Sequence, residues 1–221
     1  QVVFGKDGII NTVKKGIIVV DTSTVDPSTT RNIAEKLTEI DIEYLDCPVL
    51  GRPSAVGKWL LPAGGNSDTL ERVKPVLLTF SSNVILVGKS GAGNAVKLLN
   101  QMMFTVINAI SVEVMAIADY CGVSKEVFYN TVANSSAATV SGLFKEVGKS
   151  IIENGFSHPS FTIDLLVKDT NLALQMAKEV NAPSVIAGMI QIYNEIAIAN
   201  NLGKEDTSAL YKVFKRHFTD K

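Results

Sequence analysis

The chain has 221 residues, 46% of them hydrophobic and 19% charged, with a mean hydropathy of +0.22, a composition typical of a globular protein with one large or two smaller domains. A formal net charge of −1 and the lack of any basic cluster longer than a pair argue against nucleic-acid binding. Two cysteines and two histidines are too few for a disulfide framework, and zinc chemistry is not expected. There is no signal peptide and no uninterrupted apolar run of about 18 residues, so the sequence predicts a cytoplasmic protein without a membrane span.

The first ninety residues alternate short β-branched runs with amphipathic segments, which is the pattern of an α/β fold. Asp26 is the expected N-cap of the first helix, with Pro27 in its first turn, and Ser67 is the candidate cap of the second. A Gly/Pro-rich passage at 47–57 separates the second and third strands. The predicted strands are 17–21, 42–45, 59–63 and 83–87, and the predicted helices are 28–40 and 66–78.

Residues 94–120 contain no proline or glycine and carry apolar residues at helical spacing. They predict one helix of about 27 residues, roughly 40 Å long. Because apolar residues occur nearly all round it, we expect burial on most faces, at the centre of a domain or a dimer. The preceding Gly91-Ala92-Gly93 follows the last strand and has only part of the spacing of a phosphate-binding loop, so we interpret it as the start of the helix.

Further helices are predicted at about 124–133, 139–153, 160–181, 183–201 and 206–217. The predicted fold class is therefore α/β followed by all-α. A partial Rossmann-type sheet domain (residues 1–90), without the N-terminal glycine-rich loop, is joined by a long buried helix to an all-helical domain (residues 91–221). Ligands of proteins with two such domains usually bind in the cleft where the domains meet.

Three separated segments resemble motifs of the β-hydroxyacid dehydrogenase family, which includes 3-hydroxyisobutyrate dehydrogenases and tartronate, glyoxylate and succinic semialdehyde reductases. Residues 20–27 are similar to its D-x-S-T-x-x-P turn, 91–101 to G-x-G-x-x-x-K-x-x-N-[NQ], and 161–173 to F-x(6)-K-D-x-x-L-A. The resemblance implies a helical domain like that of 6-phosphogluconate dehydrogenase. It also implies that about 60 to 70 residues with the dinucleotide fingerprint precede this sequence, since one βαβ unit takes about 30.

The resemblance implies that Lys97 is the catalytic general acid/base. Hydride transfer to a carbonyl builds negative charge on oxygen, and a lysine can supply the proton needed there. Asn100 and Gln101 share the helix face of Lys97 and would hydrogen-bond the substrate hydroxyl or hold the amine. The alternative is a lysine that extends its amine from the end of a helix, beside two ordinary buried amides.

The same resemblance implies that Thr24, Ser23 and Lys168 contact the cofactor, NAD or NADP. It places Phe161 and Asp169 at the substrate, with Asp169 orienting a catalytic group or tuning Lys97. Simpler alternatives stay open. Ser23 and Thr24 would also fit a turn that starts a helix. Lys168 and Asp169 would also fit a solvated ion pair on the helix surface, and Phe161 an ordinary core residue.

The substrate loop departs from the family's D-x-P-V-S-G-G, because residues 46–53 read DCPVLGRP. Leu50 replaces the serine, Gly51 is retained, and Arg52 stands where a glycine is common. An inward-facing Arg52 would bind a carboxylate through two hydrogen bonds. An outward-facing one would leave a more apolar pocket, suited to a less polar aldehyde, ketone or imine.

These observations predict an NAD(P)-dependent enzyme that interconverts a small 3-hydroxy acid and its semialdehyde. It would be a homodimer or homotetramer, because family members bury the long helix between subunits. One alternative is an imine reductase-like enzyme, although imine reductases generally lack the lysine. The other is a non-catalytic dehydrogenase-like oligomerisation module, which the missing glycine fingerprint favours and Lys97, Asn100 and Lys168 oppose. The substrate and the choice between NAD and NADP are left open.

Overall fold

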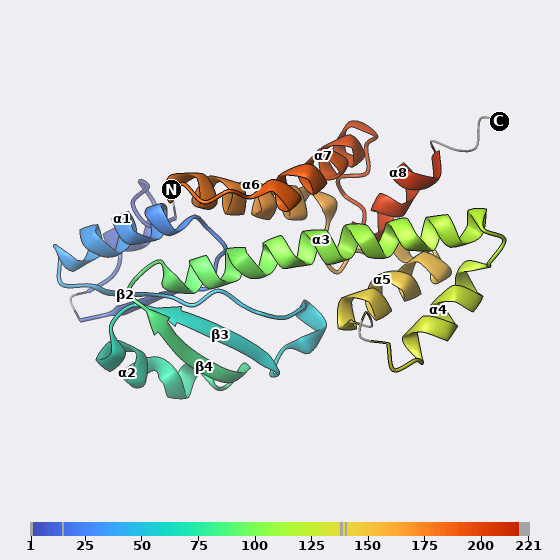
Figure 1. The fold of residues 1–221 in the computed structure, drawn as a ribbon. Coiled ribbons are helices and arrows are strands. Elements are labelled where there is room, and N and C mark those ends of the chain that lie inside the picture. The colour runs from blue at the N-terminus through green and yellow to red at the C-terminus, as the bar shows by residue number, and fades with distance from the viewer. Residues whose placement is uncertain (1, 15, 138, 140, 217–221) are drawn as a thin grey trace. The chain divides into compact units, whose positions relative to one another are not determined.

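The structure, a computed structural model, describes residues 2–14, 16–137, 139 and 141–216. It divides into two compact units, one up to Leu99 and one from Asn100 onward, and the helix α3 (Ala92–Tyr120) begins in the first and continues into the second (Figure 1). The other elements of the first unit are η1 (Ile9–Asn11), β1 (Ile18–Asp21), α1 (Pro27–Thr38), β2 (Glu43–Asp46), η2 (Pro53–Ala55), β3 (Trp59–Gly64), α2 (Ser67–Leu77) and β4 (Ser81–Gly88).

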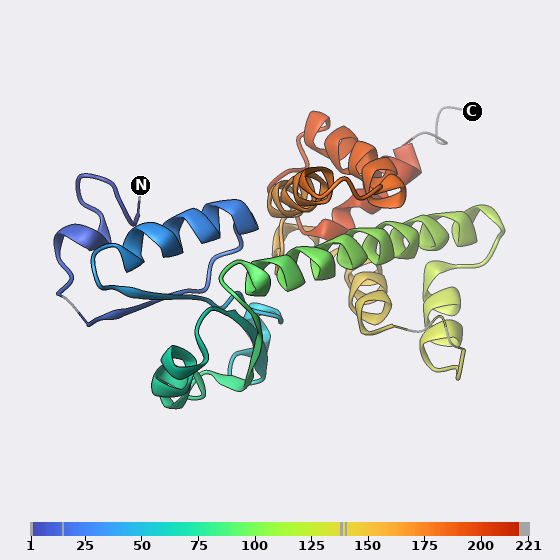
Figure 2. The same ribbon diagram turned by 60° about the vertical axis from the view of Figure 1, so that its left-hand side comes forward.

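The first unit is built on a four-stranded mixed sheet with the order β1-β2-β3-β4. The β1–β2 and β3–β4 pairs are parallel, and β2 and β3 meet in antiparallel fashion where Asp46 lies opposite Gly64. Tyr44 and Leu45, neighbours in β2, belong to separate core clusters, with α1 in the first and α2 in the second. The two helices thus cover opposite faces of the sheet (Figure 2), and the predicted Rossmann-type arrangement is confirmed.

The helix N-termini of the first unit are closed by side chains. The carboxylate of Asp26 accepts a hydrogen bond of 2.8 Å from the Thr29 amide, and Pro27 is the first helical residue, as predicted. The expected cap of α2 was wrong by one residue, because Ser67 already lies inside the helix. Asn66 is the cap, since its backbone is extended and its side chain accepts from the amides at 68 and 69.

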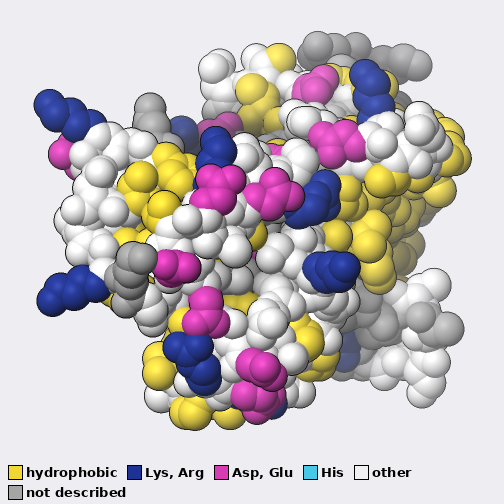
Figure 3. Space-filling model, turned by 90° about the vertical axis from the view of Figure 1, so that its left-hand side faces the viewer, with side chains coloured by type: hydrophobic (Ala, Val, Ile, Leu, Met, Phe, Trp, Pro, Cys, Tyr) yellow, Lys and Arg dark blue, Asp and Glu magenta, His cyan; other side chains and the backbone are white. Residues whose placement is uncertain are grey.

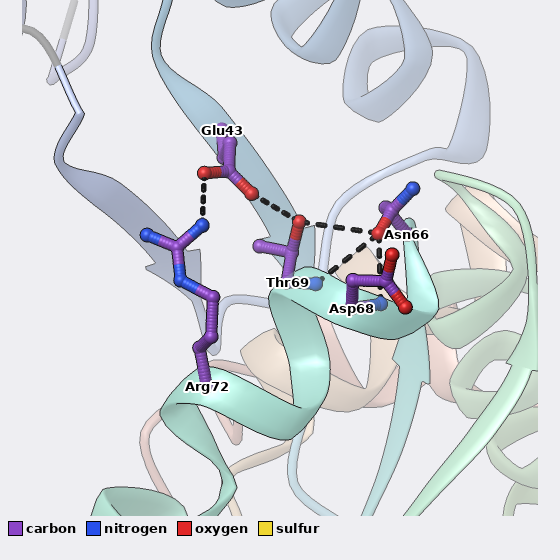
Figure 4. A network of polar contacts seen from close by, with 5 residues as sticks. All are labelled: Glu43, Asn66, Asp68, Thr69 and Arg72. Carbon is purple, nitrogen blue, oxygen red and sulfur yellow. Dashed lines mark hydrogen bonds and ion pairs between the residues drawn. The ribbon is translucent and has the colours of Figure 1, made fainter.

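On the face of the molecule shown in Figure 3, positively and negatively charged side chains are interspersed and form no continuous basic patch. One group ties α2 to β2 (Figure 4). Glu43 accepts hydrogen bonds from the Thr69 hydroxyl and from the Arg72 guanidinium, the latter at 2.5 Å. The Thr69 hydroxyl first, and then Arg72, hold the pKa of Glu43 below its ordinary value.

The second unit is helical in all its described elements: α4 (Lys125–Ala133), α5 (Gly142–Glu153), η3 (Gly155–Ser157), α6 (Ile163–Glu179), α7 (Val185–Ala199), η4 (Thr207–Leu210) and α8 (Tyr211–Arg216). The helix expected from 139 begins only at Gly142, because the Ser141 hydroxyl caps it by accepting from the Phe144 amide. The helix expected at 206–217 opens with the 3₁₀ turn η4, and residue 217 lies outside the described residues.

The long helix α3 was predicted to be buried on most faces, and within this chain that expectation is wrong in part. Leu98, Val112 and Met115 are fully buried, but one stripe is exposed, with values of 54% at Leu99, 64% at Met103, 51% at Ile110 and 49% at Ile117. The helix also contains an 18-residue window with a mean hydropathy of 1.6, so that residues 92–119 are long and apolar enough to cross a membrane by length and composition. Because 50% of the apolar window is buried inside the protein, and core helices meet the same criterion, this is weak support for a membrane span.

Candidate active site

Lys97 lies in the second turn of α3 and is partly buried. The start of this helix is fixed from inside the unit by Asp46, whose carboxylate accepts hydrogen bonds from the amides of Gly91 (2.8 Å) and Asn94 (2.9 Å). The amides that a phosphate-binding loop would offer to a ligand are therefore already bonded. This supports the interpretation of residues 91–93 as a helix start.

Ser23 and Thr24 lie in the turn between β1 and α1. Asp21 shapes this turn, because its carboxylate accepts from the Ser23 amide at 2.8 Å and from the Tyr44 hydroxyl at 3.0 Å. Burial and the neighbouring Asp21 raise the pKa of Tyr44, so the phenol stays protonated as the donor. Ser23 and Val25 line a cavity of about 420 Å³, a volume in the range of small-molecule pockets.

The expected substrate loop is held by its backbone. Leu50 and Leu60 exchange hydrogen bonds of 2.9 and 3.3 Å, and the indole of Trp59 donates to the Arg52 carbonyl at 2.7 Å. Gly51 has a φ of 149°, and a Cβ there would lie 2.4 Å from the Trp59 ring. This close approach requires glycine. The side chains of Leu50 and Arg52 are partly buried.

In the second unit, four predicted site residues form one chain of contacts. The Asn100 amide donates to Gln101 at 3.3 Å, and the Gln101 amide donates to Asp169 at 2.7 Å. The other oxygen of Asp169 lies 2.8 Å from the ammonium of Lys168. Asp169 is 3% exposed, so the alternative of a solvated surface pair is wrong for its carboxylate. Two hydrogen bonds and one ion pair thus link the residues at 100–101 to those at 168–169.

Phe161, the remaining predicted residue, is partly buried and packs edge-on against Phe104, with ring centroids 5.4 Å apart. A thiol nucleophile is excluded at Cys47, because burial, followed by Asp46 and Asp21, raises its pKa to about 12. In the part of the chain that the structure describes, no group of three or more potential metal ligands occurs.

Asp46 and Asn94 were missed as structural members of the site. Both are 0% exposed, and both lie inside the family motifs at positions to which we assigned no role. Their residue types could have indicated one. A polar side chain at the end of a buried strand, and another directly after Gly93, need hydrogen-bond partners when they are buried.

The chain is similar to known proteins over nearly its whole length. Residues 1–88 match the family described as the NAD binding domain of 6-phosphogluconate dehydrogenase, and residues 91–214 that described as NAD-binding of NADP-dependent 3-hydroxyisobutyrate dehydrogenase. L-threonate dehydrogenase of Escherichia coli K12 is 33% identical over 97% of this chain and 71% of its own, and 2-(hydroxymethyl)glutarate dehydrogenase of Eubacterium barkeri is 31% identical over 96% and 70%. A solved 3-hydroxyisobutyrate dehydrogenase of Salmonella typhimurium has a TM-score of 0.87 and 31% identity, covering 94% of this chain and 73% of its own.

The fold and these matches show that the protein is an NAD(P)-dependent oxidoreductase with a Rossmann-type unit followed by a helical unit. Within that class, the chain belongs to the β-hydroxyacid dehydrogenase family. Its named relatives are dehydrogenases and reductases of small hydroxy acids and aldehydes.

Proposed function

We propose that this protein interconverts a small 3-hydroxy acid and its semialdehyde, with Lys97 as the general acid/base. The observation that carries the proposal is the contact chain Asn100–Gln101–Asp169–Lys168, which joins residues of two motifs that are about 70 positions apart. A buried carboxylate is costly unless it is hydrogen-bonded and paired, and Gln101 and Lys168 supply these two contacts to Asp169. The proposed domains are residues 1–90 for the cofactor and 91–221 for the substrate and for oligomerisation.

Ser23, Thr24 and Lys168 would hold the nicotinamide cofactor, which accepts or donates the hydride when bound. In the oxidative direction Lys97 removes the proton from the substrate hydroxyl, and in reduction it returns that proton to the carbonyl oxygen. Asn100, at the exposed end of the contact chain, donates to the same oxygen. Gln101 is bonded to Asp169 and therefore orients its neighbours rather than the substrate.

Arg52 would bind the substrate carboxylate. The loop offers Leu50 where the family has a serine, so that hydroxyl donor is lost, and a guanidinium gives a stronger, two-pronged contact. The relatives named for L-threonate and 2-(hydroxymethyl)glutarate act on hydroxy carboxylates, which favours this role over an apolar pocket. We also assign Gly51 and Phe161 to substrate binding.

We further propose that the protein is a cytoplasmic homodimer or a larger assembly of identical chains. Four apolar side chains of α7 share one face at helical spacing and are more than half exposed: Val185 (69%), Ile186 (64%), Met189 (61%) and Ile192 (59%). Together with the exposed stripe of α3, they form apolar surface of the kind that self-association buries.

The test is an activity panel of glyoxylate and of succinic, methylmalonic and tartronic semialdehydes, each with NADH and with NADPH, on the full natural chain. We expect turnover of at least one semialdehyde. Reduction of a cyclic imine with no turnover of any semialdehyde would instead indicate the imine reductase-like alternative. Failure to bind either nicotinamide would indicate a non-catalytic oligomerisation module.

A further inference from the structure

Asn94 connects the start of α3 to the cofactor turn through its side chain. It is 0% exposed, its Oδ1 accepts from the Val25 amide at 3.1 Å, and its Nδ2 donates to the Thr30 hydroxyl at 3.2 Å. Because the Val25 amide can only donate, the orientation of the Asn94 side chain is fixed. Val25 directly follows Ser23 and Thr24, so this bond sets the end of the turn.

The backbone of Asn94 connects the same helical turn to the substrate loop. Its amide donates to Asp46, the last residue of β2, from which the loop 47–53 begins. The packing leaves no room for a shift, because a Cβ at Gly93 would lie 2.5 Å from the Asp46 carbonyl oxygen, and one at Gly64 2.4 Å from the Asp46 carboxylate. One buried residue therefore touches two separate segments of the proposed site.

We propose that Asn94 is a positioning residue, which sets the cofactor turn and the substrate loop in register with Lys97, one helical turn further along α3. The inference rests on the proposed function of Lys97. Asn94 does not touch the reacting atoms. Its side chain fixes where the nicotinamide end is held, and its amide fixes where the substrate loop begins.

The physical cost of losing this link is larger in catalysis than in stability. A single hydrogen bond is a small part of the free energy of folding, whereas a misplacement of about 1 Å at a reacting centre lowers the rate by up to about a hundredfold. A residue with only a structural role would show the first effect without the second.

The test removes the partner of Asn94 rather than Asn94 itself. Thr30→Val removes the buried hydroxyl that accepts the hydrogen bond from the Asn94 side-chain amide, and it keeps the size of the side chain. Thr30→Ser restores the hydroxyl. Thr69→Val is the matched control, because Thr69 is another buried threonine of the first unit, with its hydroxyl bonded to Glu43 on β2. Asn94→Ala serves as the more severe variant.

Three quantities are measured for each variant on the full natural chain: kcat, the melting temperature, and the Kd of the reduced nicotinamide from the change in its own fluorescence on binding. For Thr30→Val and Asn94→Ala we expect kcat to fall about tenfold or more and Kd to rise severalfold. Thr30→Ser should restore both values. Thr69→Val should lower the melting temperature comparably and leave kcat and Kd unchanged.

Equal kcat and Kd in Thr30→Val and Thr69→Val would overturn the positioning role. The Kd readout does not depend on Lys97, so the two proposals fail separately. If Lys97→Ala stays active, the acid/base assignment falls and the Kd comparison still decides the role of Asn94. If Lys97→Ala is inactive and Thr30→Val behaves like Thr69→Val, only the positioning role falls.

Discussion

Gly93 lies where α3 meets the strands β2 and β3, and its lack of a side chain is what lets the helix start there. A Cβ at this position would lie 2.5 Å from the carbonyl oxygens of Asp46 and Pro62, and backbone atoms cannot give way cheaply. At Gly142, the first residue of α5, a Cβ would meet nothing within 4 Å.

Gly93→Ala should therefore lower the free energy of unfolding by about 1–3 kcal/mol, the usual cost of overpacking. The control Gly142→Ala should be neutral or stabilising by up to about 1 kcal/mol, because alanine loses less entropy in a helix. Denaturant midpoints of the two variants measure the difference. Equal midpoints would show that the close approach of helix and sheet is not maintained in solution.

At the residue scale, the sequence could indicate which residue types belong to the site but not how they are bonded. The burial of Asp169 was not foreseen, because a charge inside an amphipathic segment is typical of a solvated face. Its partner Gln101 is 68 positions away, a separation at which local patterns carry no information. The bonds of Asn94 to Val25 and Thr30, at separations of 69 and 64, were hidden for the same reason.

At the scale of elements, the group of Glu43, Thr69 and Arg72 holds α2 against β2 (Figure 4). The pKa of Glu43 in the folded chain lies below the ordinary value of 4.5. Its contribution to stability is therefore present above about pH 4.5 and is lost as the pH falls through the lowered folded value.

Glu43→Gln should flatten the dependence of stability on pH below about 4.5, because glutamine does not titrate there. The free energy of unfolding, measured from denaturant curves over a series of acidic pH values, tests this expectation. Glu39→Gln, which removes an exposed carboxylate at the end of α1, is the control. An unchanged pH slope in Glu43→Gln would contradict the assignment.

The strands were predicted within two residues at their ends, because β-branched runs bounded by turn residues are a local signal. The N-cap of α2 could not be assigned from residue type, since asparagine and serine are both good caps and stand side by side at 66 and 67. The sequence could not predict that β2 and β3 pair in antiparallel fashion, because the relative direction of two strands depends on the path of the whole loop between them.

At the scale of the whole molecule, the composition of α3 predicted burial without saying which chain supplies the cover. Leu99, Met103, Ile110 and Ile117 are exposed in a single chain, although they are as apolar as the buried Leu98, Val112 and Met115 of the same helix. Hydropathy does not distinguish a face that is buried within one chain from a face that another copy covers.

If a second copy covers the apolar face of α7, Met189→Glu combined with Ile192→Glu should produce a monomer, because an unpaired carboxylate in such an interface is costly. Sedimentation velocity on the full natural chain measures the change. Val127→Glu, at a position on α4 that is 59% exposed, is the control and should leave the assembly intact. An unchanged sedimentation coefficient in the double variant would contradict this interface.

The central claim is that Lys97 transfers the proton while other residues hold the cofactor, and the Lys97→Ala variant tests it most directly. With a substrate found in the panel, kcat should fall by about 10²–10⁴, the usual contribution of general acid/base catalysis. The Kd of the reduced nicotinamide, followed by its own fluorescence, should stay within about twofold, since the loss would lie in the transition state and not in binding. A variant that binds cofactor normally and keeps its kcat would contradict the account.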